Sequence, residues 1–245
     1  NLLSKPWVAD LMRLNKSFVV KRNLSGPRAL LAATKLLSQY IRYSVGTIHN
    51  PIWIAHREGR AKDGRDLTEP AVIKMLALSR VRGEAPEEVL SELNIVPLVI
   101  SYEVDPCDAL KAAELAAGED YVKAEFEDVF SIARGITGEK GCVHLHFGEP
   151  LPGNLSVEGV AAAVDQQMAE HYRLYQTNRW AWEWLHGERV PGTIVFHEGL
   201  MTERSFRARL DSVPDEHGRW LLNMYANPVN RRLALDANAQ DSSCD

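Results

Sequence analysis

Basic residues gather in two short stretches near the start of the chain. Lys21 and Arg22 follow an apolar run, and four more basic residues lie between Arg57 and Arg65, mixed with acids and two glycines. Guanidinium groups hold phosphate oxygens through paired charge-assisted hydrogen bonds, and glycine lets backbone N–H groups approach the same anion closely. These residue types favour a site for a phosphorylated ligand. The alternative is a solvated, salt-bridged loop.

The charge is divided unevenly along the chain. Of the 28 Lys and Arg, 15 lie in residues 1–82, against 5 of the 33 Asp and Glu, so this part has a balance of +10 and the rest −15. A basic segment predicts an anionic partner: phosphate groups, an anionic membrane surface, coenzyme A or nucleic acid. The alternative is that the two oppositely charged parts face each other. Nucleic acid is disfavoured, because no aromatic residues are interleaved with the basic ones for base stacking.

Composition indicates a soluble globular protein. The chain has 245 residues, of which 45% are hydrophobic and 25% charged, as in one large domain or a domain with an appendage. Its three cysteines lack metal-type spacing, which predicts a reducing, cytoplasmic compartment. The longest apolar run, Ile95 to Ile100, is too short to span a bilayer. The chain begins at Asn1, within a helical pattern, so we expect further residues upstream.

The two basic stretches each follow a predicted buried strand. The strands are Ser17 to Val20 and Pro51 to Ala55, and a helix from about Ser25 to Val45 is predicted between them. In a strand–helix–strand unit the strands are parallel, and their carboxyl ends open at one edge of the sheet, where ligands bind. The pattern therefore predicts that the Lys21–Arg22 and Arg57–Arg60 clusters converge.

The rest of the chain predicts further helices and two more strands. The strands are Asn94 to Glu103, interrupted by Pro97, and Cys142 to Phe147. We expect an α/β fold: a mixed, mostly parallel sheet flanked by helices, with a helical C-terminal extension. The expected boundaries are a domain over 1–152, the extension over 153–237 and a disordered tail over 238–245. The predicted helices of this part cover 68–80, 86–93, 105–117, 124–136 and 156–175.

Three stretches, taken in order, carry a family resemblance: Phe18-Val19-Val20-Lys21-Arg22, Arg57-Glu58-Gly59-Arg60-Ala61-Lys62-Asp63-Gly64 and Ile95-Val96-Pro97-Leu98. They resemble the second, third and fourth sequence blocks of the glycerol-3-phosphate and 1-acylglycerol-3-phosphate acyltransferases. The spacing is also similar, from residue 1 to about 150. The segment Tyr225-Ala226-Asn227-Pro228-Val229 is similar to an extension of one bacterial branch of that family.

The resemblance implies an enzyme of phospholipid synthesis. Such an enzyme moves a fatty acyl group from acyl-coenzyme A or acyl carrier protein to glycerol phosphate or lysophosphatidate. By resemblance, Arg22, with Lys21 beside it, and Arg60 hold the acceptor phosphate, Glu58 and Gly59 shape the pocket, and Pro97 forms its wall or the acyl channel. The implied location is cytoplasmic, on the inner face of the membrane, and the implied chemistry uses no metal and no cofactor besides the acyl donor.

The sequence departs from the family pattern in two places. The family's base is a histidine in a first block, His-x-x-x-x-Asp, and none of the eight histidines here has an aspartate five residues on. We expect this block upstream of Asn1, which would leave the present chain inactive alone. The third block commonly contains Glu-Gly-x-Arg, whereas Arg60 follows Gly59 directly, as in a loop one residue shorter. The alternative function is a non-catalytic phospholipid- or phosphate-binding module.

Several other residues have two readings. His56 is either a replacement base or a hydrogen-bonded residue at a strand end. His144 and His146 lie on one face of their predicted strand but lack a third ligand for a metal. The tryptophans Trp180, Trp182 and Trp184 either pack in the core or anchor at a membrane interface.

Overall fold

The protein is mainly helical in the computed structural model, which describes residues 10, 14, 20, 24–57 and 61–241. Within these residues the strands form a single two-stranded antiparallel sheet. The predicted α/β fold, with a mixed, mostly parallel sheet, is therefore wrong. The chain divides into two compact units, described one at a time. Unit 1 comprises Asn1–Glu58, Glu69–Ile95 and Pro150–Ala162, and unit 2 comprises Gly59–Thr68, Val96–Glu149 and Ala163–Asp245.

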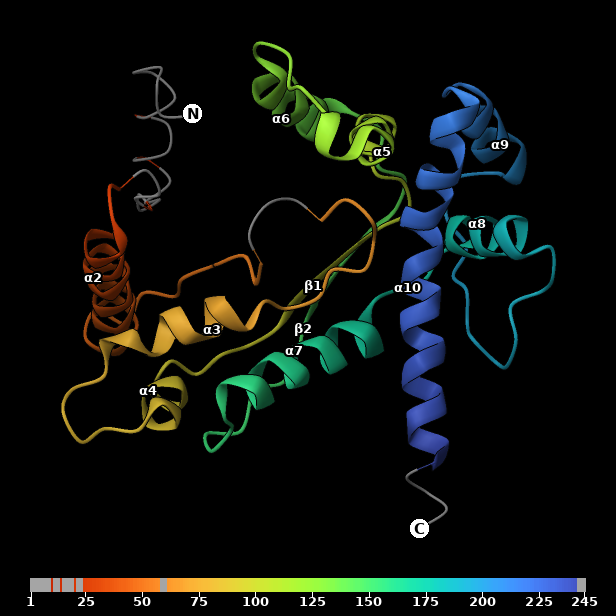
Figure 1. Cartoon of the computed structure of the whole chain (residues 1–245). Helices are drawn as coiled ribbons and strands as arrows, with labels where there is room; N and C mark the ends of the chain where they lie inside the picture. The colour runs from red at the N-terminus through yellow and green to blue at the C-terminus, as the bar shows by residue number, and fades with distance from the viewer. Residues whose placement is uncertain (1–9, 11–13, 15–19, 21–23, 58–60, 242–245) are drawn as a thin grey trace. The chain divides into compact units, whose positions relative to one another are not determined.

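Unit 1 is a cluster of helices (Figure 1). In chain order these are α2 (Pro27–Gly46), α3 (Pro70–Leu76), η2 (Ala77–Ser79) and α4 (Pro86–Glu92). Each α-helix has proline in its first turn, where the missing N–H has no helical acceptor to lose. The buried hydroxyl of Ser38 joins α2 to η2: it donates to the Leu76 carbonyl at 2.7 Å and accepts from the Ser79 N–H at 2.8 Å. The predicted helices over 68–80 and 86–93 are thus confirmed with shorter bounds.

The sheet of unit 2 pairs β1 (Leu98–Tyr102) with β2 (Val143–Phe147). Val99 lies opposite His146, and Ser101 opposite His144. The predicted alternation in β2 is confirmed: both histidines are half-buried, whereas the apolar side chains that alternate with them, Val143, Leu145 and Phe147, are exposed. Pro97, which interrupts the predicted strand Asn94 to Glu103, lies directly before the first residue of β1.

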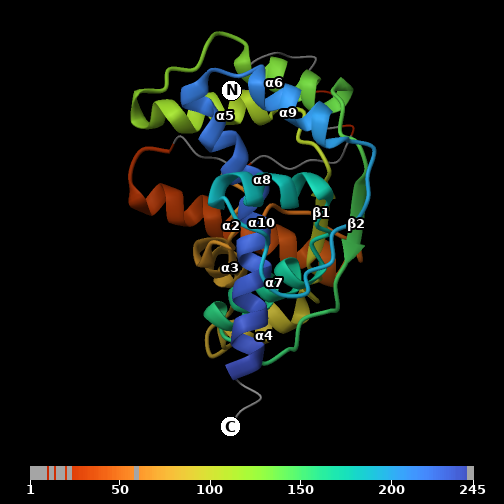
Figure 2. The same ribbon diagram turned by 90° about the vertical axis from the view of Figure 1, so that its right-hand side faces the viewer.

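The helices of unit 2 form its core. They are α5 (Asp108–Ala117), η3 (Gly118–Asp120), α6 (Glu127–Thr137), α8 (Gln176–His186), α9 (Glu203–Asp211) and α10 (Asp215–Asp241), while α7 (Val157–His171) runs from unit 1 into unit 2. The long helix α10 packs on α8 and α5, and Figures 1 and 2 both show α8 lying across it. Trp180 and Trp182 are 9% and 4% exposed, and Trp184 packs against this core. Core packing, rather than membrane anchoring, accounts for these tryptophans.

The two strands predicted before residue 56 are not found among the described residues, and for Pro51 to Ala55 the reason is physical. Pro51 to Ala55 is irregular, and Trp53 is 75% exposed. A short apolar run can favour an extended backbone, but a strand exists only when another strand supplies its hydrogen bonds. The predicted strand Ser17 to Val20 lies outside the described residues, apart from Val20. The strand–helix–strand unit, on which the parallel sheet depended, is therefore not formed by the described residues.

Candidate functional site

Most of the predicted site residues lie outside the part of the chain that the structure describes. These are Lys21, Arg22, Glu58, Gly59 and Arg60. Their convergence on one anion therefore stays a prediction. Pro97 is described, and its carbonyl accepts a hydrogen bond from the Gly148 N–H at 2.8 Å. It is thus fixed at the start of the hairpin, while its role in an acyl channel stays a prediction as well.

Arg57 is the first residue of the second basic stretch and belongs to unit 1. Its guanidinium Nε is buried and has no hydrogen-bond partner among the described residues. A buried, unpaired donor on a charged group is costly, and an anionic ligand would satisfy it. His56, next to it, accepts a hydrogen bond at its carbonyl from the Glu69 N–H at 3.0 Å. Its backbone is thus fixed at a turn rather than at the end of a strand.

The basic stretch resumes in unit 2, where its second half is held in a defined shape. Lys62 Nζ pairs with Glu114 Oε1 of α5 at 2.5 Å. The Arg65 N–H donates to Asp63 Oδ1 at 3.1 Å, which closes a tight turn around Gly64. Gly64 has φ +72°, in the left-handed region that favours glycine. This half is therefore a salt-bridged turn, which agrees with the alternative of a solvated, salt-bridged loop.

Glu103 is a buried carboxylate that the sequence did not single out. It is 1% exposed, and its carboxylate accepts three backbone N–H donors: Cys142 at 2.7 Å, Leu200 at 2.9 Å and Met201 at 2.6 Å. Burial alone would raise the pKa of Glu103, but these hydrogen bonds outweigh it and hold the pKa below the usual value. The same carboxylate leaves no room for a Cβ at Gly141 or Gly199, since that atom would lie 2.3 and 2.1 Å from its oxygens.

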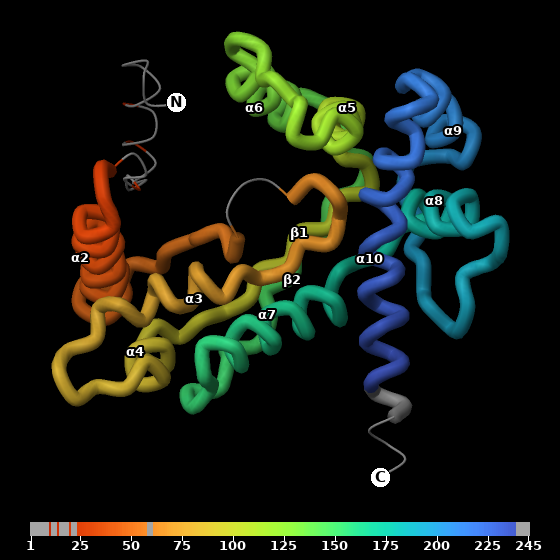
Figure 3. Tube along the Cα trace, in the orientation of Figure 1, coloured from red at the N-terminus to blue at the C-terminus, as the bar shows by residue number. Residues whose placement is uncertain are grey.

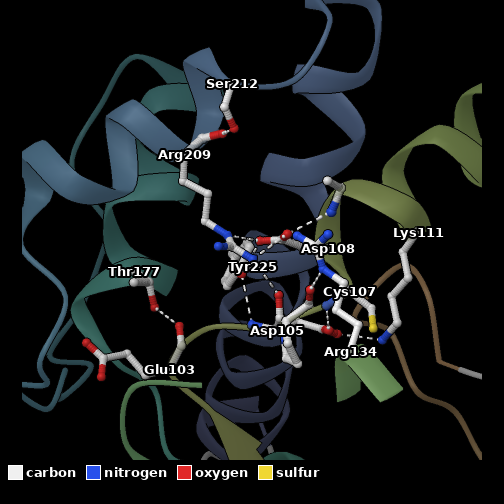
Figure 4. A network of polar contacts seen from close by, with 12 residues as sticks. Glu103, Asp105, Cys107, Asp108, Lys111, Arg134, Thr177, Arg209, Ser212 and Tyr225 are labelled. Atoms are coloured by element: carbon white, nitrogen blue, oxygen red, sulfur yellow. Dashed lines mark hydrogen bonds and ion pairs between the residues drawn. The ribbon is translucent and has the colours of Figure 1, made fainter. Parts of the chain in front are cut away.

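Asp108, at the start of α5, is the centre of a second buried network, which Figure 4 shows. It is fully buried, and its Oδ2 accepts from Arg209 Nε at 2.5 Å and from the Tyr225 hydroxyl at 2.7 Å. Its Oδ1 accepts from Arg209 Nη2 at 2.7 Å and from the Ala109 N–H at 2.7 Å. Burial and the charge of Asp108 raise the pKa of Tyr225 well above its usual value. This phenol therefore stays protonated near neutral pH; it donates to Asp108 and accepts from the Asp105 N–H at 3.0 Å.

Both networks are structural. Every oxygen of the two carboxylates is occupied by protein donors, so neither is available to a substrate. Asp105 extends the second network through Lys111 Nζ at 2.5 Å. One signal in the sequence could have found these acids: Glu103, Asp105 and Asp108 follow an apolar strand within six residues, where solvation is poor.

The histidines of unit 2 gather beside the sheet. His146 stacks on His171 with ring centroids 4.0 Å apart, and the rings of His144 and His146 are 6.3 Å apart. Burial and the nearby charges of Arg173, His146 and His197 lower the pKa of His144. Among the described residues, no group of three or more His, Cys, Asp or Glu side chains is arranged to hold a metal ion.

A cavity of about 360 Å³ lies on α2 of unit 1. Arg42, the basic residue of its lining, contacts Glu84 at 2.5 Å and Glu92 at 2.6 Å. The hydrogen bond from Arg42 lowers the pKa of Glu84 to about 2, so the ion pair persists across the neutral range. Because two carboxylates already surround this guanidinium, the cavity is a poor site for a phosphate. Its lining residues are Gln39, Arg42, Tyr43, Gly46, Thr47, Ser79 and Glu92.

Among the helices that the structure describes, none is both long enough and apolar enough to cross a membrane. Comparison of the chain with protein-family models, with curated proteins and with solved structures finds no match.

Proposed function

We propose that the protein is an acyltransferase of phospholipid synthesis. It moves a fatty acyl group from acyl-coenzyme A or acyl carrier protein to a hydroxyl of glycerol phosphate or lysophosphatidate. The observation that carries the proposal is the order of three sequence blocks: Phe18 to Arg22, Arg57 to Gly64 and Ile95 to Leu98. Each block alone is weak, but three in order with similar spacing are specific.

One described feature, in unit 1, supports an anion site at the start of the second block. The Nε of Arg57 is buried without a hydrogen-bond partner among the described residues, and an anion bound there would accept a hydrogen bond from it. In unit 2, the turn at Gly64 fixes the backbone of the second half of the block, where Lys62 is paired with Glu114.

In the proposed reaction, a histidine base takes the proton of the acceptor hydroxyl. The hydroxyl oxygen then attacks the thioester carbonyl, the C–S bond breaks, and the thiol leaves with a proton. Lys21, Arg22 and Arg60 hold the acceptor phosphate. In the family this base is the histidine of a His-x-x-x-x-Asp block, a sequence that the 245 residues do not contain. Its substrates place it on the cytoplasmic face of the membrane, as a peripheral protein.

A second candidate is a module that binds phospholipid or phosphate without catalysis. It is favoured by one observation, the lack of a His-x-x-x-x-Asp sequence within the 245 residues. The two candidates differ in turnover. An enzyme converts radiolabelled lysophosphatidate to phosphatidate in the presence of acyl-coenzyme A, whereas a binding module retains the labelled lipid unchanged.

The sharpest test of the phosphate assignment is Arg60→Ala. Loss of a charge-assisted contact weakens the binding of the acceptor by about 2–4 kcal/mol. The acceptor KM is therefore expected to rise roughly 30- to 1,000-fold. The KM of the acyl donor stays unchanged, because the donor does not use this contact. Steady-state kinetics with each substrate varied in turn gives both values.

Arg204→Ala is the matched control, because Arg204 is exposed on α9 and carries the same charge. We expect both KM values of this variant to equal those of the unmodified protein. An acceptor KM that is the same in the two variants would remove Arg60 from the phosphate site.

A further inference from the structure

The cavity of unit 1 is lined by a buried serine whose hydroxyl has no partner in the protein. The cavity lies where α2 contacts η2 and α4, and the two α-helices can be followed in Figure 3. Ser79, in the lining, is 5% exposed, and its Oγ is buried without a hydrogen-bond partner among the described residues. A buried hydroxyl without a partner costs free energy. Because a serine hydroxyl turns between staggered positions at low cost, a ligand in the cavity can supply the missing partner.

The charged side chains at this cavity disfavour an anion and favour a cation. Arg42 bonds carboxylates through all of its guanidinium nitrogens: Nε bonds Glu92 Oε2 at 2.8 Å, while Nη1 and Nη2 bond the two oxygens of Glu84 at 2.9 and 2.5 Å. One guanidinium against two carboxylates leaves an excess of negative charge. Both contacts with Glu92 use Oε2, so Oε1 of this half-exposed carboxylate can accept a further donor.

The end of α2 adds to the negative potential of the cavity. Its last turn, which lines the cavity through Tyr43 and Gly46, contains no basic residue. The C-terminus of a helix carries a partial negative charge, which favours a cation placed beside it. The Tyr43 side chain is 55% exposed, and an aromatic ring attracts a cation over its face. Gln39 and Thr47 contribute further polar side chains to the lining.

We propose that this cavity binds a small ligand with a protonated amino group and several hydroxyl groups, such as an amino sugar. The ammonium group bonds Glu92 Oε1, and a hydroxyl group of the ligand bonds Ser79 Oγ. The volume of about 360 Å³ is in the range of sites for small molecules. The site goes beyond the proposed function, because all of its residues belong to unit 1 and none of them is assigned to acyl transfer.

NMR titration of the full chain tests the site with three probes that differ in charge: glucosamine, glucose and inorganic phosphate. At about pH 6, well below the pKa of an amine, glucosamine differs from glucose by an ammonium group in place of one hydroxyl. We expect glucosamine to shift the amide resonances of Gly46 and Thr47 and to bind at least about tenfold more tightly than glucose. Equal binding of the two sugars would overturn the proposal. So would shifts of these resonances with phosphate alone, or with none of the probes.

Glu92→Gln tests the contact with the ammonium group. The amide keeps the shape of the carboxylate but removes its charge, so we expect the Kd for glucosamine to rise about tenfold and the preference over glucose to disappear. Glu87→Gln is the matched control, because it removes the same charge from the first turn of α4 at a residue outside the lining. Its Kd should stay within about twofold of the unmodified protein, as expected for a screened surface charge. Equal effects in the two variants would mean that only the net charge matters, and the site would be rejected.

Ser79→Ala separates a hydroxyl that binds a ligand from one that supports the fold. The ligand-free variant should have an unchanged or higher melting temperature, because the hydroxyl has no partner to lose, whereas its Kd for glucosamine should rise about fivefold. Ser38→Ala provides the contrast: that hydroxyl makes two hydrogen bonds, so its removal should lower the melting temperature. An unchanged Kd in Ser79→Ala, or a loss of melting temperature as large as that of Ser38→Ala, would show that Ser79 is no ligand contact and would overturn the proposal.

Discussion

The two buried carboxylates of unit 2 are satisfied in opposite ways. Glu103 accepts three backbone N–H groups, from Cys142, Leu200 and Met201, and its hydrogen-bonding groups are all neutral. Asp108 instead accepts a cation, the guanidinium of Arg209, together with the Tyr225 hydroxyl. Both acids are at most 1% exposed. The same cost of burying a negative charge is thus met by dipoles at one site and by an opposite charge at the other.

The two arrangements differ in which buried group is left unpaired when the acid is removed. Without Glu103, three N–H groups lose an acceptor, and loops at Gly141 and Gly199 lose the group around which they close. Without Asp108, a largely buried guanidinium is left unpaired, which costs more than an unpaired amide. Both acids connect distant parts of the chain, since Glu103 joins the hairpin to residues 200–201, and Asp108 joins α5 to α9 and α10.

The largest effect is expected for Asp108→Asn. The substitution keeps the shape but places an amide NH₂ against the donors of Arg209, Tyr225 or Ala109, so a buried cation loses its counter-charge. We expect a loss of about 3–5 kcal/mol in the free energy of unfolding, measured by urea denaturation. The linear dependence on urea should keep its slope, because the surface exposed on unfolding is unchanged.

An exposed ion pair provides the control for this substitution. Asp128 contacts Lys123 at 2.9 Å, with both side chains about half exposed at 48% and 49%. Asp128→Asn should therefore lower the free energy of unfolding by less than about 1 kcal/mol. Equal losses in the two variants would mean that the buried network stabilises no more than a surface pair, and the comparison drawn above would be wrong.

A smaller loss is expected for Glu103→Gln. The amide can keep its oxygen toward Cys142 and Leu200, which leaves the Met201 N–H facing an NH₂ group. One buried donor without an acceptor costs about 1–3 kcal/mol in the free energy of unfolding. Glu125→Gln, on an exposed side chain, is the matched control and should be neutral. A loss larger than that of Asp108→Asn would reverse the order that the neutral and charged partners predict.

Much of the helical structure could be predicted from the sequence, and the reason is local. Pro27 and Pro86 mark helix starts, and the periodic apolar residues after them give α2 and α4 within a few residues of the predicted bounds. The alternation of β2 was likewise readable. The sequence did not predict whether another element covers the apolar face of β2. In the structure this face is open: Val143, Leu145 and Phe147 are 50%, 50% and 67% exposed. A strand sequence specifies its two faces but not which of them meets another element.

The sheet and the site were harder to predict because they depend on distant partners. Pro51 to Ala55 has the composition of a strand but no pairing, and the parallel sheet inferred from it was wrong. The charged residues 57–65 predicted a site for an anionic ligand, whereas no local pattern singled out Glu103 or Asp108. Their partners, Met201 and Arg209, lie about 100 positions away, beyond the reach of any local pattern. Gly64 was visible as a glycine, but its need for a small residue comes from Met224.

The smallest effect is the acid dependence of the stability that Glu103 contributes. The pKa of Glu103 is lowered in the folded protein, whereas an unfolded glutamate has a pKa of about 4.3. Between these values the unfolded chain binds more protons, so the contribution of Glu103 is fully present above about pH 4.3 and is lost as the pH falls through the folded pKa. The difference in unfolding free energy between the unmodified protein and Glu103→Gln should therefore be constant at neutral pH and become smaller by pH ~3, because the glutamine cannot titrate.

Urea denaturation of both proteins from pH 7 to pH 3 measures this difference in unfolding free energy. A difference that stays constant down to pH 3 would show that the charge of Glu103 contributes nothing beyond its shape, and that backbone dipoles alone do not stabilise a buried carboxylate here.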